Sequence, residues 1–183
     1  LAGENVETLN NYNIKKIVTS CPHCLNTIKN EYPQLGGDYE VFHHTQFIKK
    51  LVDENKLPIG SNLKDTITYH DSCYLGRYNQ EYESPRKLLN NSGNEPIVEM
   101  KRHGIESFCC GAGGARMWME EKIGSRINET RTDEALSTGA STVATACPFC
   151  MTMLSDGITA KGKSEIVKTK DVAEIVLEAM EAS

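Results

Sequence analysis

Residues 142–151 have the sequence Thr-Val-Ala-Thr-Ala-Cys-Pro-Phe-Cys-Met, and residues 16–25 have the matching sequence Lys-Ile-Val-Thr-Ser-Cys-Pro-His-Cys-Leu. In each stretch a short run containing β-branched residues ends at a cysteine, which predicts a β-strand. The proline that follows suits the first turn of an α-helix, where its missing N–H would have no partner anyway. Both C-P-x-C motifs are therefore predicted at a turn from a strand into a helix. A thiolate there faces the positive end of the helix dipole, which lowers its pKa and favours metal binding.

The sequence after each motif repeats one order of elements: a helical stretch, a short strand and an amphipathic helix. The later strands and helices are expected at residues 39–42, 45–54, 165–167 and 170–180. Such a duplication predicts two related units. We assign residues 1–60 to the C-terminal part of a first unit and residues 61–183 to a complete second unit. The alternation predicts an α/β fold of duplicated strand–helix units, with a mostly parallel sheet and cysteines at the carboxyl ends of its strands.

The section between the two motifs is expected to complete the second unit. The expected elements are strands at 66–70, 97–99 and 105–108, and helices at 84–91 and 114–137. In the last helix, Met119, Ile123 and Ile127 recur at i, i+4 spacing, which predicts one apolar face. Trp118 is expected to serve packing rather than to form a flat platform for a quinone.

Five of the seven cysteines form the pattern C-x35-C-C-G-x35-C-P-x-C, made by Cys73, Cys109, Cys110, Cys147 and Cys150. If their strands are neighbours, three distant points of the chain meet at one place. Iron–sulfur clusters are held by cysteine thiolates, whereas a structural zinc takes four ligands. Five cysteines exceed what one zinc uses, so the count favours a cluster over zinc or inert buried thiols.

The cysteine pattern resembles the CCG cysteine-rich domain of the B and D polypeptides of heterodisulfide reductase, and of the iron–sulfur subunits of glycolate, lactate and glycerol-3-phosphate oxidising systems. Residues 108–119 and 146–154 are similar to membrane-associated iron–sulfur oxidoreductases linked to electron-transfer flavoprotein and menaquinone. The resemblance implies a [4Fe-4S] cluster, non-cubane in the heterodisulfide reductase branch. The ligands it implies are Cys73, Cys109, Cys110, Cys147 and Cys150, while Cys21 and Cys24 would close a first cluster whose other ligands lie upstream of Leu1. Ser72 and Ala115 stand where many members have proline and glycine, and neither change removes a ligand.

The same resemblance implies a redox subunit, an oxidoreductase fragment inactive on its own. It would relay electrons between electron-transfer flavoprotein, or another redox subunit, and a quinone or disulfide acceptor. Direct reduction of a heterodisulfide at the cluster is an alternative reaction. A zinc-stabilised structural or interaction module without redox activity is an alternative of another class. The motif at Cys21 and Cys24 is also typical of thiol–disulfide oxidants, but Phe149 stands at the position of His23 in the second copy, so the duplication favours a metal half-site.

The glycines after the paired cysteines are predicted to bind the cofactor. Gly111, Gly113 and Gly114 allow the backbone to approach a cluster closely and to donate N–H groups to its sulfurs. A phosphate loop is not favoured, because the G-x-G-x-x-G spacing and a following Lys-Ser/Thr are both missing.

Several polar residues near the cysteines are candidates for supporting roles. His70, Asp71 and Arg77 flank Cys73 and are hypothesised to tune the potential of a cluster or to supply a proton. His43-His44 is expected to be hydrogen-bonded rather than to bind metal.

Composition excludes several classes of protein. The 183 residues carry a formal net charge of −5 and dispersed lysines, so no basic patch indicates nucleic-acid binding. No run approaches the roughly 18 apolar residues of a membrane span, and no stretch has the n-region, h-region and cleavage site of a signal peptide. Unpaired cysteine usage without secretory signals predicts a cytoplasmic location. The full-length protein is expected to associate with the inner face of the cell membrane, if at all, through residues upstream of Leu1.

Overall fold

The computed structural model describes residues 1–121 and 123–182. Its strands are β1 (Lys16–Thr19), β2 (Glu40–His43), β3 (Ile67–His70), β4 (Thr142–Thr145) and β5 (Lys168–Asp171). Its α-helices are α1 (Ala2–Asn11), α2 (Pro22–Asn26), α3 (His44–Asp53), α4 (Cys73–Gly76), α5 (Glu83–Ser92), α6 (Ile127–Leu136), α7 (Pro148–Ala160) and α8 (Val172–Glu181). A π-helical turn at Thr27–Glu31 and a 3₁₀ turn at Tyr32–Leu35 extend α2, and further 3₁₀ turns lie at Gly104–Glu106 and Arg116–Trp118.

The strands form two small parallel sheets, which confirms the predicted α/β class. β1 pairs with β2, and in the second sheet β4 lies between β3 and β5. The register places Ile67 beside Thr142 and Thr142 beside Lys168, so all three strands end at one edge. Every residue of β3 and β4 is buried, as expected for parallel strands covered on both faces.

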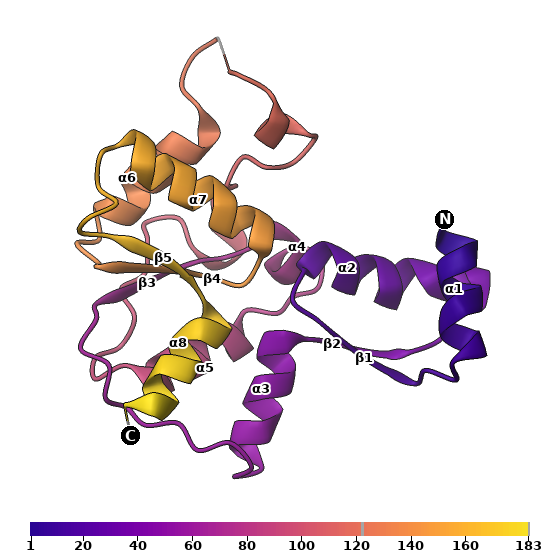
Figure 1. Cartoon of the computed structure of the whole chain (residues 1–183). Helices are drawn as coiled ribbons and strands as arrows, with labels where there is room; N and C mark the ends of the chain where they lie inside the picture. Colours follow the sequence, from indigo (N-terminus) through magenta and orange to yellow (C-terminus); the bar gives the residue numbers. More distant parts are fainter. Residues whose placement is uncertain (122, 183) are drawn as a thin grey trace.

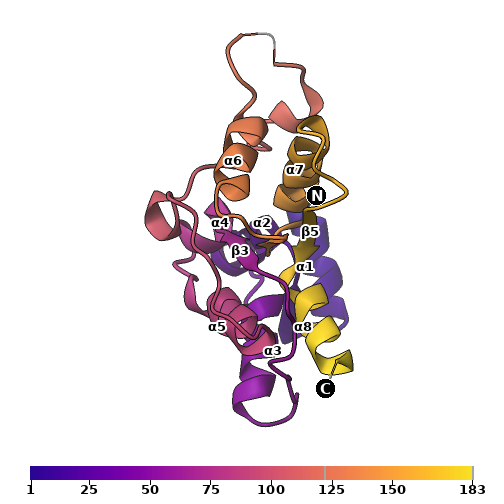
Figure 2. The same ribbon diagram turned by 90° about the vertical axis from the view of Figure 1, so that its left-hand side faces the viewer.

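Helices cover both faces of the three-stranded sheet. Figure 1 shows α6 and α7 on one face and α5 and α8 on the other, and α7 and α8 both contact β4 and β5. The β1–β2 sheet lies to one side with α1 and α2, and α3 packs against both α5 and α8. Figure 2 shows the same layers from the side.

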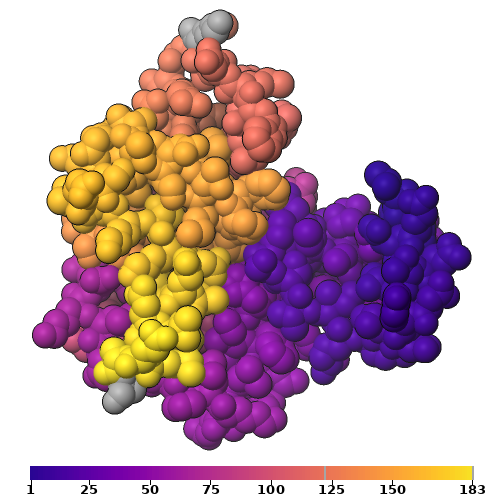
Figure 3. Space-filling view, in the orientation of Figure 1, coloured from indigo at the N-terminus to yellow at the C-terminus, as the bar shows by residue number. Residues whose placement is uncertain are grey.

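The largest hydrophobic core runs through both sheets. It joins Val6 and Leu25 near β1 and β2 to Leu75, Leu88 and Ile175 around the second sheet, all at most 4% exposed. Figure 3 shows the N-terminal residues as a lobe beside the body that carries β3–β5. The division at residues 60 and 61 stays a prediction.

The predicted long helix at 114–137 is wrong. Of the described residues in this range, only those of α6, from Ile127, are α-helical, and the positive φ angles of Ala115 (60°) and Gly124 (73°) interrupt the pattern before it. Met119 and Ile123 are 52% and 87% exposed, because the loop rises away from the body (Figure 1) and offers the apolar stripe no neighbour. The packing role expected for Trp118 is also wrong, since it is 80% exposed. Lys122 lies outside the described residues.

Three predicted strands also differ from the structure. Residues 97–99 form no strand, although the Val98 N–H donates one hydrogen bond to the Ile67 carbonyl beside β3. Residues 105–108 begin in a 3₁₀ turn after Gly104, whose φ of +56° takes the chain out of the extended region. β5 begins at Lys168, after the residues at which it was expected. The other predicted strands and helices lie within a few residues of their expected positions.

Candidate metal centre

The carboxyl edge of the β3–β4 pair brings two cysteine turns together. His70 at the end of β3 lies beside Thr145 at the end of β4. Cys73 begins α4, and Cys147 precedes Pro148, the first residue of α7. Cys150 follows on the first turn of α7. Parallel pairing therefore places these turns at one end of the sheet, as the sequence predicted.

Cys109 and Cys110 reach the same place without a strand. Cys110 packs with Cys147, Cys150 and Met153 in a separate buried cluster, with Cys109 at its border. The thiols interact in a continuous chain, from Cys73 to Cys109 to Cys110 to Cys150 to Cys147. The five predicted sulfurs therefore form one row of neighbours, and within it the Cys110 and Cys150 sulfurs lie within 4.8 Å of each other. All seven cysteines are free thiols.

The pKa values of these cysteine thiols differ strongly from one another. Hydrogen bonds from the Cys110 and Cys73 thiols lower the pKa of Cys109 to about 2, and the Gly111 N–H contributes at 3.3 Å from the Cys109 Sγ. The hydrogen bond to Cys109 raises the pKa of Cys110 to about 12, and it also raises the pKa of Cys73. One thiolate is thus stabilised by neighbours that stay protonated. Ionising all five requires positive charge among them, which a bound metal centre supplies.

A polar network fixes the loop that carries Cys109. The Asp71 carboxylate is 3% exposed and accepts two hydrogen bonds from Arg86, at 2.7 and 2.8 Å. It also accepts from the Gly104 N–H at 2.8 Å, and its carbonyl accepts from the Ser107 hydroxyl at 3.1 Å. Arg77 donates to the carbonyls of Ser107 and Ile105. Asp71 and Arg77, two of the predicted supporting residues, therefore position the segment before the cysteines.

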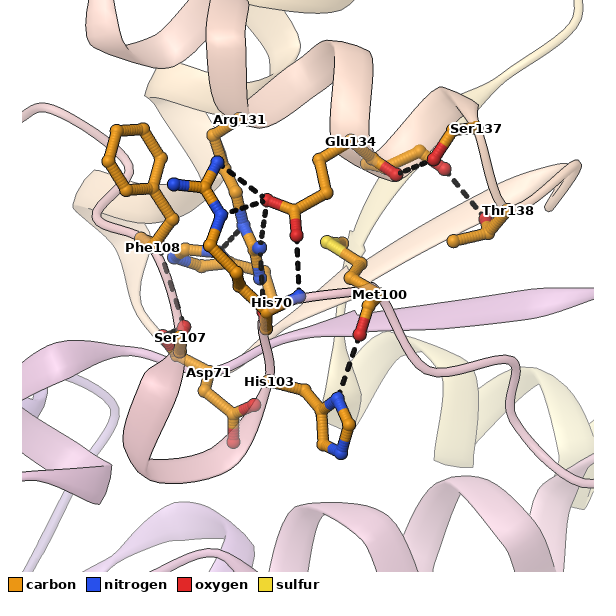
Figure 4. A network of polar contacts seen from close by, with 12 residues as sticks. His70, Asp71, Met100, His103, Ser107, Phe108, Arg131, Glu134, Ser137 and Thr138 are labelled. Atoms are coloured by element: carbon orange, nitrogen blue, oxygen red, sulfur yellow. Dashed lines mark hydrogen bonds and ion pairs between the residues drawn. The ribbon is translucent and has the colours of Figure 1, made fainter.

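His70, the third supporting residue, lies at the site itself. One of its ring nitrogens and the sulfurs of Cys110 and Cys150 all lie within 4.8 Å of one another. Its Nδ1 accepts a hydrogen bond from Arg131 Nε at 3.0 Å. Figure 4 shows Arg131 between His70 and the Glu134 carboxylate.

Arg131, Glu134 and Arg102 were not predicted from the sequence. Arg131 Nη1 donates to Glu134 Oε2 and to the Arg102 carbonyl, both at 2.9 Å, and Glu134 also accepts from the Arg102 N–H. Burial raises the pKa of Glu134, but these hydrogen bonds outweigh it and lower the pKa overall. A signal was present, because α6 buries Asn128, Arg131, Thr132 and Ala135 at helical spacing. An arginine on that stripe indicates a buried partner.

The three positions of the predicted cofactor-binding glycines differ in how strictly their backbone conformation and surroundings require glycine. Gly111 has φ +90°, and a Cβ there would lie 3.1 Å from the Ile127 Cβ. Gly114 has φ +63° in open space, while neither a positive φ nor a close neighbour requires glycine at Gly113. Of these three glycines, Gly111 donates its N–H to a cysteine sulfur, that of Cys109.

Cys21 and Cys24 lie at the start of α2, where Cys21 precedes Pro22 as predicted. Burial raises the pKa of Cys21, contrary to the expected lowering, whereas the hydrogen bond with Cys150 lowers the pKa of Cys147. Helix α2 has five residues before a π-helical turn, so its dipole is weak compared with that of α7. Their role in a first cluster stays a prediction.

The two C-P-x-C turns approach each other through aromatic rings. The His23 ring lies 4.2 Å from the Tyr74 ring and 5.5 Å from that of Phe149. Burial lowers the pKa of His23, and the charge of Cys109 opposes that effect. A cleft beside the cysteines is lined by His23, Phe149, Trp118 and the glycine loop. This cleft therefore lies between His23 of the first C-P-x-C turn and the glycine loop that follows Cys110.

The histidine pair at the junction of β2 and α3 is hydrogen-bonded, as expected. His43 contacts the Thr45 hydroxyl at 2.8 Å and the Ser20 carbonyl at 3.3 Å. His44 Nε2 contacts Asp171 Oδ1 at 2.8 Å. Both rings therefore have ordinary protein partners.

Comparison with known proteins identifies relatives along nearly the whole chain. The chain is 47% identical over 99% of its length to the EtfAB:quinone oxidoreductase of Syntrophomonas wolfei, and 47% identical over 98% of its length to the Bacillus subtilis protein named "Probable iron-sulfur-binding oxidoreductase FadF". It is 38% identical over 98% of its length to one polypeptide of the dihydromethanophenazine:CoB–CoM heterodisulfide reductase of Methanosarcina barkeri. The chain spans 26% of the first two relatives and 44% of the third.

The family model for the CCG cysteine-rich domain matches residues 1–29 and 67–155. These ranges contain both C-P-x-C turns, the lone Cys73 and the Cys109-Cys110-Gly111 loop. The expected resemblance is confirmed, and the chain belongs to the CCG cysteine-rich domain family.

Proposed function

We propose that this chain binds a [4Fe-4S] cluster and relays electrons within a larger iron–sulfur oxidoreductase. The proposed ligands are Cys73, Cys109, Cys110, Cys147 and Cys150. The single observation that supports the proposal is that these five cysteines, drawn from three separate turns, are neighbours in one continuous row.

The donor set favours a cluster over zinc. A structural zinc is four-coordinate, and five sulfurs leave one without a function. Cys109 and Cys110 are adjacent, so one turn would offer two thiolates to a centre that contains several metal atoms. Cys110, Cys147 and Cys150 are 4% exposed or less, so the chain keeps water from most of the site. A bound cluster supplies one-electron transfer, with a potential set by charge, hydrogen bonds to sulfur and exposure.

The protein's own residues prepare that site in two ways. The Gly111 N–H points at the sulfur with the lowest pKa, Cys109, and a donor there stabilises negative charge on sulfur. The ion pair of Asp71 and Arg86 holds the loop before the paired cysteines. Cys21 and Cys24 are assigned to a separate first centre, which rests on the duplicated motif.

The names of the relatives support the partners that we propose. One is an EtfAB:quinone oxidoreductase and another is part of a heterodisulfide reductase. We assign a flavoprotein-type donor, such as electron-transfer flavoprotein, and a quinone or disulfide acceptor. The cleft lined by the glycine loop that follows Cys110, with the exposed Trp118 at its wall, is the surface to which we assign the approach of a redox partner. Among the residues that the structure describes, no helix has the length and apolarity needed to cross a bilayer.

Anaerobic metal analysis tests the proposal. Iron with matching acid-labile sulfide supports it, whereas colourless protein with one zinc overturns it in favour of a structural module. Cys110→Ser should abolish the spectrum of the second cluster, because its sulfur lies in the middle of the chain of contacts. Cys24→Ser is the matched control, since this exposed thiol belongs to the other turn and the second cluster should survive its loss.

The electron route needs a second measurement on the full-length protein. Reduction of the cluster by electron-transfer flavoprotein, followed by reoxidation with a quinone, supports the relay. Turnover of a heterodisulfide without either partner would assign direct disulfide reduction instead.

A further inference from the structure

His70 occupies a place that a metal ligand could fill. It ends β3, is 1% exposed, and has a ring nitrogen within 4.8 Å of the Cys110 and Cys150 sulfurs. Histidine and cysteine together are a common zinc-binding set, so proximity alone does not separate a ligand from a hydrogen-bond donor.

Arg131 decides between these roles. Arginine has five N–H donors and no acceptor, so the Arg131 Nε, 3.0 Å from His70 Nδ1, must donate. Nδ1 therefore carries a lone pair, and the proton of a neutral imidazole must be on Nε2. If Nε2 bound a metal as well, the ring would have to lose both protons. A metal-binding histidine ordinarily donates its other N–H to a partner, and His70 cannot do so here.

The surroundings hold this arrangement rigidly. The Arg131 side chain is fully buried, and Nη1 is fixed by Glu134 Oε2 and the Arg102 carbonyl. Glu134 is held in turn by the Arg102 N–H and guanidinium. Figure 4 shows how these groups bracket the arginine opposite His70. Because Nδ1 accepts the hydrogen bond from Arg131, the His70 ring is a neutral imidazole.

We propose that His70 is not a ligand but donates a hydrogen bond through Nε2–H to a cluster-bound sulfur, that of Cys110 or Cys150, and that Arg131 is the positioning residue that fixes the donor nitrogen. The inference rests on the proposed function, because it assigns a role toward the same cluster. A hydrogen bond to a thiolate stabilises the more negative, reduced cluster, and it therefore raises the reduction potential.

The test uses the full-length protein, reconstituted anaerobically with its clusters and labelled with ¹⁵N-histidine. Electron–nuclear double resonance on the reduced second cluster should show one exchangeable proton close to the spin and a weak ¹⁵N coupling transmitted through sulfur. His70→Leu should abolish both signals while the iron and sulfide content is retained. At a fixed solution potential, the ratio of oxidised to reduced cluster should rise about tenfold, which is about 59 mV for one electron.

Two further variants separate positioning from general damage. Arg131→Met frees the choice of tautomer, so the exchangeable-proton coupling should weaken and the potential should fall in the same direction. His103→Leu is the matched control, because His103 is exposed and its Nδ1 contacts the Met100 carbonyl at 2.8 Å. It should leave both the coupling and the potential unchanged.

The outcomes are distinct. A strong ¹⁵N coupling typical of direct binding, or loss of iron in His70→Leu with a normal fold, overturns the inference by making His70 a ligand. An unchanged potential in His70→Leu also overturns it. If His70→Leu fails to fold, the proton and nitrogen couplings of the unmodified protein still decide the question. Protein that assembles no iron and sulfide refutes the proposed function itself, which is read from the metal analysis alone.

Discussion

Replacing Arg86 by methionine is predicted to lower the free energy of unfolding and to release the loop that carries Cys109 and Cys110. All five N–H groups of the guanidinium donate: two bonds reach Asp71, two reach Glu99 and one reaches the Tyr82 carbonyl, at distances from 2.7 to 3.1 Å. Methionine keeps an unbranched apolar stem but removes every donor, together with the guanidinium that lies over the Tyr69 ring at 5.2 Å from its centroid.

The expected cost follows from what is left behind. The Asp71 side chain is 3% exposed and would keep only the Gly104 N–H as a partner for its carboxylate. Leaving one member of a buried ion pair uncompensated costs about 3–5 kcal/mol. For a domain of this size each kcal/mol lowers the melting temperature by roughly 2–4 °C, so a fall of about 6–20 °C is expected.

Urea denaturation of the anaerobically purified protein measures this loss as a lower free energy of unfolding. The matched control is Lys16→Met, which breaks the pair of Lys16 with Glu40 at 3.0 Å, where the two side chains are 50% and 53% exposed. An exposed pair contributes about 0–1 kcal/mol. The argument fails if the two variants lose the same stability. Arg86→Met should also bind less iron, because Asp71 holds the loop that leads to Cys109.

Three further changes follow from the packing. Gly157→Ala on α7 should destabilise the protein by about 1–3 kcal/mol, because the added Cβ would lie 3.1 Å from the Thr132 Cβ on α6. The control is Gly3→Ala on α1, whose Cβ meets nothing within 4 Å and which should stabilise the protein by about 0.5–1 kcal/mol. Equal urea midpoints for the two variants would contradict the close packing of Gly157 against Thr132. Gly111→Ala should reduce iron content in metal analysis, because φ is +90° and the loop has no room for the methyl group. The pKa of Glu134 is lowered on folding, so its stabilisation is complete above about pH 4.3 and is lost as pH falls through the folded pKa; urea titrations of Glu134→Gln should show a flatter acid limb.

Local rules made much of the scaffold predictable. A strand that ends at a cysteine, followed by proline, specifies its own turn, and both C-P-x-C turns lie where the sequence placed them. Parallel pairing then follows from the alternation of elements, and it brings Cys73 and Cys147 to one edge. The capping boxes that start α3 at His43 and α8 at Asp171 repeat in both halves, which accords with the duplication.

The same rules failed where tertiary contacts decide. The stripe of Met119, Ile123 and Ile127 has helical spacing, yet it has no apolar surface to pack against, and spacing alone does not stabilise a helix. Residues 105–108 have β-propensity, but the positive φ of Gly104 and the bonds of the loop to Asp71 and Arg77 hold them outside the sheet. Sequence periodicity carries no information about a partner 33 residues away, as Asp71 is from Gly104.

The cysteines of the candidate centre are therefore held in place in two ways, which differ in how easily a single substitution disrupts them. Cys73 and Cys147 are placed by ladders of parallel strands, whose backbone hydrogen bonds do not depend on any one side chain. Cys109 and Cys110 are placed by charged side chains, above all Asp71 with Arg86, so a single substitution can release them. Because the five sulfurs must lie together for a cluster to bind, the site is only as stable as its ion-paired half. Replacing Arg86, which bonds Asp71 rather than a cysteine, should therefore empty the site before it unfolds the sheet.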